Sequence, residues 1–233
     1  ERNSTVQQIT RRDATAAQLT RLANAIIEYS VFNSNLYPCP ALLGTAVDLS
    51  SGANAAFGAE VATCSSVAGD VNNASIDTTS TLIAIIDSAG DGNATGDPVL
   101  RGMVPVLALS SYGIAPADAL DPWNNRIMYV VNRTLTAGGT PAANTVTITD
   151  KRTGYTLVKP DFILISYGRD GVGGHKSGYN DNTTPSIACT LGGTLMPYEN
   201  CDNDLNFYIA PTYTAPNAGT GDYFDDILTW YRQ

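Results

Sequence analysis

The stretch ISYGRDGVGG (residues 165–174) is an apolar strand segment that runs directly into a glycine-rich turn carrying one carboxylate. A second stretch, DDILTW (residues 225–230), places a carboxylate pair before an apolar run that ends on a tryptophan. A carboxylate in a glycine-rich turn, with two more on a returning segment, supplies the all-oxygen ligands that Ca²⁺ prefers. Together the two stretches indicate a strand that ends in a loop able to bind a hard cation.

Outward from this loop, the chain shows the patterns of several short strands. Phe162–Ser166 is a continuous apolar run, and residues 126–131 have the composition of a strand. Residues 145–149 are all β-branched and alternate between polar and apolar side chains, which is also typical of a strand. Glycines at 138–139 and the segment 152–155 mark turns on either side of the last of these strands. We expect a short antiparallel sheet of three or four strands packed against a helix, which is an α+β fold.

The N-terminal part of the chain predicts the helix that covers this sheet. Between Thr10 and Asn33 the apolar residues recur at three- and four-residue steps, which is typical of an amphipathic helix. Thr10 or Asp13 is a suitable N-cap, and the helix ends before Pro38 and Pro40, which a helix interior does not accommodate. The expected core-facing side chains are Leu19, Leu22, Ala23, Ile26, Ile27 and Tyr29.

We expect a single globular domain over residues 1–233. Two long stretches of it are polar or rich in small residues, and loops of such length seldom persist without a function or disulfide bracing. The expected regions are a helix (1–35), an irregular connection (36–100), a sheet region (101–174), an inserted loop (175–221) and a C-terminal segment (222–233).

Composition limits the classes of function. The chain has 233 residues and a net charge of −9, and only 15% of its residues are charged. Such a surface repels phosphate backbones, so we expect no general nucleic-acid binding. No apolar run is long enough to cross a bilayer and no signal peptide is recognisable, yet the sequence begins abruptly in helix-like residues. We expect from this start a trimmed or processed form of a longer protein.

The four cysteines, Cys39, Cys64, Cys189 and Cys201, fall into two local pairs in polar, glycine-rich sequence. An even number of such cysteines is typical of disulfides formed in an oxidising compartment. We therefore expect Cys39–Cys64 and Cys189–Cys201 bridges, although four cysteines allow three connectivities. A zinc site is the alternative, which is disfavoured because the chain has no CxxC spacing and one histidine.

Several short blocks carry a resemblance to a known family. After the helix come LYPCPA (36–41), RGMVPVLAL (101–109), YGI (112–114) and DALDPWNNRIMYVV (118–131), followed by the two stretches quoted first. In order and local spacing these blocks resemble type IV pilins, and the last two resemble the signature of the type II secretion major pseudopilin. The resemblance covers somewhat under half of the chain.

This resemblance implies a filament subunit that polymerises through an N-terminal apolar helix missing from the sequence. Its partners would be other pilin or pseudopilin subunits, and it would be anchored in the inner membrane before assembly. The periplasm, or an extracellular filament at the cell surface, would be its location. Residues 42–100 and 175–221 would be insertions, which favours a minor or atypical pilin. Trp123-Asn124-Asn125 departs from the family's Trp-Gly-Asn.

The resemblance also implies a calcium site that stabilises the C-terminal loop. Asp170 stands where the family's loop aspartate stands, and Asp226 matches the aspartate of the family's D-I-x-x-W motif. Ser166 and Asp225 would add oxygen ligands, and three carboxylates brought together favour a bound cation that neutralises them. The alternative to a calcium site is that Asp170-Gly171 forms an ordinary turn and that Asp225 and Asp226 are solvated residues at the start of a helix.

Two other classes of function remain open. A secreted or filament-tip module that binds a ligand or glycan agrees with the tyrosines clustered in residues 198–231. A hydrolase is disfavoured, because the single histidine, His175, stands in a glycine-rich loop and no G-x-S-x-G elbow is present. We therefore expect a structural protein without enzyme activity.

Overall fold

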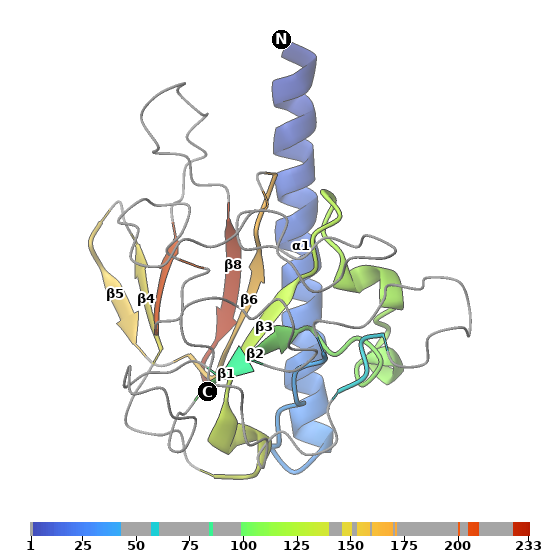
Figure 1. Cartoon of the computed structure of the whole chain (residues 1–233), viewed down its shortest axis with the longest axis vertical. Coiled ribbons are helices and arrows are strands. Elements are labelled where there is room, and N and C mark those ends of the chain that lie inside the picture. Colours follow the sequence, from blue (N-terminus) through green and yellow to red (C-terminus); the bar gives the residue numbers. More distant parts are fainter. Residues whose placement is uncertain are drawn as a thin grey trace.

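The computed structural model consists of one long helix followed by short strands in two sheets (Figure 1). This element order confirms the α+β class. The residues that the structure describes are 2–42, 57–60, 84–85, 99–139, 146–150, 153–158, 160–169, 171, 200, 205–209 and 226–233.

The helix α1 (Arg2–Phe32) begins earlier than the sequence predicted. The expected N-caps at Thr10 and Asp13 are wrong, because both residues lie inside the helix. The Thr10 hydroxyl donates to the Val6 carbonyl at 2.9 Å, so this side chain satisfies its hydrogen bond within the helix and marks no boundary. The predicted C-terminal end at Asn33 is confirmed within one residue.

The C-terminal part of α1 packs on the body of the protein, against β6 (Phe162–Ser166) and β8 (Ile227–Tyr231). The helix extends past the sheets at its other end (Figure 1), where residues 6–14 are exposed or half-buried. We call residues 6–14 the helical arm. No helix among the described residues is long and apolar enough to cross a membrane. The buried apolar residues of α1 are Leu19, Leu22, Ala23, Ala25 and Ile26.

The main sheet has five antiparallel strands in the order β1-β2-β3-β6-β8. The apolar run predicted as a strand is confirmed as β6, which pairs with β3 on one side and β8 on the other, and all five of its residues are buried. Ser166 at the end of β6 pairs with Ile227 at the start of β8. The remaining strands are β1 (Ala84–Ile85), β2 (Val99–Met103) and β3 (Met128–Asn132).

A second sheet of three strands was not expected, so the prediction of one sheet with three or four strands is wrong. β4 (Thr147–Asp150) pairs antiparallel with β5 (Thr156–Val158) and parallel with β7 (Asn206–Ile209). Gly154, at φ +67°, lies in the turn between β4 and β5, where the sequence predicted a turn. β7 lies within the region 175–221 that was expected to be a loop, because a strand of four residues gives little periodic signal.

Short 3₁₀ helices join the strands of the main sheet. Two of them lie between β2 and β3. The Gln18 side chain donates to the carbonyls of Asp118 at 2.9 Å and Leu120 at 2.8 Å, which fastens α1 to this connection. The three 3₁₀ helices of the described chain are η2 (Ser110–Tyr112), η3 (Pro116–Ala119) and η4 (Arg133–Thr136).

Candidate functional site

The DPWNN stretch forms a tight turn organised by one buried carboxylate. Asp121 is 5% exposed, and its Oδ1 accepts hydrogen bonds from the backbone N–H groups of Trp123 (2.9 Å) and Asn125 (2.8 Å). Such bonds to nearby N–H groups fold the local backbone into a turn. Asn124 adopts the left-handed conformation at φ +69°, which glycine and asparagine accept more readily than other residues. Asn124 stands where a Trp-Gly-Asn sequence would have glycine, and its left-handed conformation therefore keeps the turn intact.

This turn is fixed to the end of β6 by buried side chains. The Ser166 hydroxyl donates to Asp121 Oδ2 at 2.7 Å, and the Asn125 amide donates to the Gly168 carbonyl at 2.6 Å. Ser166 and Asn125 are fully buried. Because a buried donor without a partner is costly, these bonds hold the turn and the strand end in one arrangement.

The Asp121 carboxyl has a structural role. Burial raises its pKa above the ordinary value, and the hydrogen bonds from Ser166, Asn125 and Trp123 oppose that rise. Its two oxygens already accept from four donors, and none of the described basic side chains forms an ion pair with it. It is therefore a poor candidate for a metal ligand.

A second buried polar unit centres on Asn200. The Asn200 amide donates to Asp226 Oδ2 at 2.9 Å and to the Tyr208 carbonyl at 3.0 Å, while its Oδ1 accepts from the Tyr208 N–H at 2.7 Å. Asp226 directly precedes β8 and Tyr208 lies on β7. Asn200 therefore links the main sheet to the second sheet.

Arg101 on β2 brings a buried positive charge to the same unit. Its guanidinium donates to the Tyr167 hydroxyl and to the Asn200 carbonyl, the latter at 3.3 Å. The Tyr167 hydroxyl also lies 3.3 Å from that carbonyl, and the guanidinium carbon lies 6.0 Å from the centre of the tyrosine ring. Arg101 and Tyr167 are almost completely buried, so the unit belongs to the core.

The structure brings two of the four predicted calcium ligands to one end of the main sheet. Ser166 and Asp226 are both buried, and the register pairs Ser166 with Ile227, the residue after Asp226. Both side chains are oxygen donors, the ligand type that calcium prefers. Asp170 and Asp225 lie outside the described residues. Among the residues that are described, no group of three or more His, Cys, Asp or Glu side chains is close enough together to hold a metal ion.

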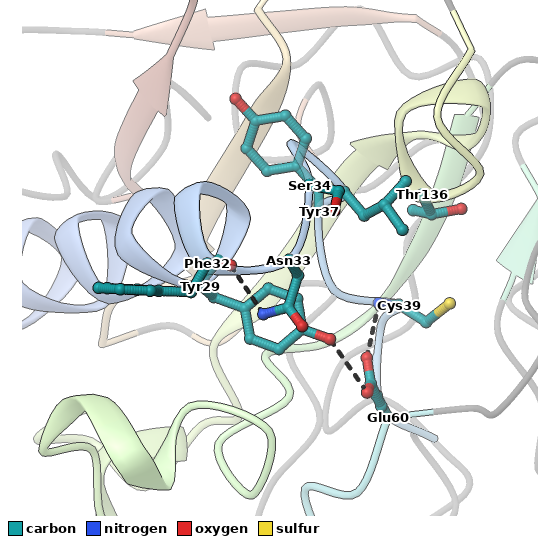
Figure 2. A pocket seen from close by; sticks show the side chains of 9 residues that line it. Tyr29, Phe32, Asn33, Ser34, Tyr37, Cys39, Glu60 and Thr136 are labelled. Atoms are coloured by element: carbon teal, nitrogen blue, oxygen red, sulfur yellow. Dashed lines mark hydrogen bonds between the residues drawn. The ribbon is translucent and has the colours of Figure 1, made fainter.

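A pocket of about 410 Å³ lies at the C-terminal end of α1 (Figure 2). The Glu60 carboxylate lines it and accepts hydrogen bonds from the Tyr29 hydroxyl (3.3 Å) and from the backbone N–H of Cys39 (3.1 Å). The Asn33 amide donates to the Tyr29 carbonyl at 2.8 Å and so closes the helix end. Burial, and then the negative charge of Glu60, raise the pKa of Tyr29 to about 12.

One of the four cysteines is described. Cys39 beside this pocket is disulfide-bonded. Cys64, Cys189 and Cys201 lie outside the described residues, so the expected pairing stays a prediction.

Sequence reasoning missed the roles of Asn200 and Glu60. Each acts on residues far away in the chain, and no local pattern distinguishes either from an ordinary loop residue. Asp121 did carry a signal, because an aspartate at the start of DPWNN is typical of a turn in which the side chain accepts backbone hydrogen bonds.

Comparisons of the chain with protein-family models, with curated proteins and with solved structures found no match.

Proposed function

We propose that this chain is a structural subunit of a type IV pilin-like filament, either a pilus or a pseudopilus of the type II secretion kind. The observation that carries the proposal is the arrangement of α1, which packs on the main sheet at one end and projects from it at the other (Figure 1). On the helical arm, Val6 and Ile9 are 62% and 57% exposed. Exposed apolar side chains on a projecting helix are suited to burial against other subunits.

In this proposal the protein polymerises through an apolar helix upstream of the arm and is held in the inner membrane by that helix before assembly. The filament stands in the periplasm or at the cell surface, which agrees with the disulfide at Cys39. The role is structural and not enzymatic.

Calcium has a stabilising role in the proposal. Ser166, Asp170, Asp225 and Asp226 would bind the ion and fasten the C-terminal loop to the end of the sheet. Ser166 and Asp226 lie at the same end of β6 and β8, although strand alternation points Ser166 to the face of its partner Ile227 and Asp226 to the opposite face. The binding energy of such an ion would add to the stability of the folded protein.

The test is assembly in cells that express the protein together with its upstream sequence. Val6→Asp with Ile9→Asp should abolish incorporation into filaments, seen by electron microscopy of sheared surface material, because charges replace the apolar contact surface. The melting temperature of the purified chain should not change, since both side chains are exposed. Tyr155→Asp is the matched control, because it removes an exposed hydrophobic side chain outside the arm (66% exposed) and should leave assembly intact.

Two results would overturn the proposal. One is normal assembly of the Val6→Asp and Ile9→Asp variant. The other is recovery of the wild-type protein only as a free secreted monomer, which would favour the ligand- or glycan-binding module.

A further inference from the structure

The Glu60 carboxylate lines the pocket at the C-terminal end of α1. Glu60 is half-buried and accepts from two neutral donors, Tyr29 and Cys39, and none of the described basic side chains forms an ion pair with it. The last turn of α1 carries no basic residue, so the helix itself places no positive charge at the negative end of its dipole. The carboxylate and the helix end both favour a positively charged ligand.

The dimensions of the pocket suit a side chain better than a bare ion. About 410 Å³ is far more space than one ion with oxygen ligands occupies, and the lining includes apolar surface from Tyr29 and Leu36. A guanidinium is planar, is weakly hydrated and stacks on aromatic surfaces, and it forms charge-assisted hydrogen bonds with a carboxylate. An arginine side chain therefore matches the chemistry of this pocket.

A second copy of the chain presents such a side chain. The first 21 residues carry four arginines and two carboxylates, whereas the whole chain has a net charge of −9. The basic residues are thus concentrated toward the helical arm. Arg11 on the arm is exposed, and its side chain forms no ion pair with the described residues.

We propose that the pocket bounded by Tyr29, Asn33 and Glu60 receives the Arg11 guanidinium of a second copy of this chain. Within one chain, Arg11 and Asn33 are separated by roughly 33 Å along the helix, at about 1.5 Å per residue. The contact therefore joins different surfaces of two copies and repeats head to tail, which generates an open chain wherever the rotation between copies does not close a ring. It rests on the proposed filament function and names one contact between successive subunits.

Zero-length carbodiimide cross-linking of an Arg11→Lys variant tests this contact. Carbodiimide joins an amine to a carboxylate that touches it, so the docked lysine should be linked to Glu60, as identified by peptide mass spectrometry. The separation within one chain is too large for such a link, so the product must join two copies. Glu28, exposed on α1 close to the pocket, is the internal control.

We expect the link to Glu60 to exceed the link to Glu28 at least tenfold at low salt, and to fall severalfold at about 1 M salt, where charge attraction is screened. An excess of Glu60→Gln chain should compete, since its Arg11 occupies pockets, whereas an excess of chain carrying both Glu60→Gln and Arg11→Glu should not. Links spread equally over both glutamates, or equal competition by the two chains, would overturn the contact.

The outcome is separable from that of filament assembly. Filaments in cells without the link to Glu60 would mean that the subunits assemble by other contacts, and the pocket proposal would be wrong. A specific link to Glu60 from a protein that never forms filaments would support the contact and overturn the filament function.

Discussion

Replacement of Asp121 by alanine is expected to lower the free energy of unfolding by about 4 kcal/mol. The change removes the acceptor for the Ser166 hydroxyl and for the backbone N–H of Asn125, and both residues are 0% exposed. A buried donor without a partner costs about 1–3 kcal/mol, so two such donors account for about 4 kcal/mol. This loss is a large part of a typical stability of about 5–15 kcal/mol.

Urea unfolding followed by circular dichroism measures this loss. Asp13→Ala is the matched control, because Asp13 is exposed on α1 and its replacement should change the free energy by less than about 0.5 kcal/mol. Adding Ser166→Ala to Asp121→Ala removes the orphaned hydroxyl and should recover about 1 kcal/mol. A loss below about 1 kcal/mol for Asp121→Ala, or no recovery in the double variant, would refute the assignment of the turn's stability to this carboxylate.

The raised pKa of Asp121 gives the same prediction a pH dependence. A carboxyl whose pKa is higher in the folded chain contributes stability that is fully present below the unfolded pKa and is lost as pH rises through the folded pKa. Asp121→Asn cannot titrate. The unfolding free energy of the wild type should therefore rise relative to that of Asp121→Asn as the pH is lowered from about 7 to about 4. A difference that stays constant over this range would contradict the raised pKa.

Three further predictions concern other parts of the chain. Gly58→Ala should lower the free energy of unfolding in urea by at least about 2 kcal/mol more than Gly113→Ala does. Both glycines have positive φ, but a Cβ at Gly58 would lie 2.3 Å from a buried side chain, whereas a Cβ at Gly113 would meet open space. Calcium at about a hundredfold above its Kd should raise the melting temperature by about 5 °C over chelator, and Asp226→Ala should remove this shift. Glu60→Gln should lower the pKa of Tyr29 from about 12 toward its ordinary value, measured by alkaline absorbance titration against Tyr29→Phe. No calcium shift, or an unchanged tyrosine titration, would contradict the respective prediction.

The parts of the fold that the sequence predicts are those whose signal lies within one element. β6 is five consecutive buried residues, and its apolar run is visible without knowledge of its neighbours. The apolar stripe of α1 is equally local. The second sheet depends on the parallel pairing of Thr147 with Asn206, which are 59 positions apart. No local pattern specifies that pairing, because contacts between distant segments decide it.

The candidate site shows the same limit. Ser166 and Asp226 were predicted as neighbours through a resemblance, and the strand register does bring them to one end of the sheet. Their hydrogen-bond partners were not predicted, since Asp121 is 45 positions from Ser166 and Asn200 is 26 positions from Asp226. Polar residues of this kind look like ordinary loop residues in the sequence, and only their burial reveals their role.

The two buried polar units limit what the proposed calcium ion could do at this end of the sheet. Ser166 is held by the turn at Asp121, and Asp226 is held by Asn200, so the ends of β6 and β8 are fixed from both sides by the chain itself. A cation at this end would therefore fasten the loop between the two strands, and the strand pairing does not depend on it. Chelation should lower the melting temperature and leave the far-ultraviolet circular dichroism of the native protein unchanged.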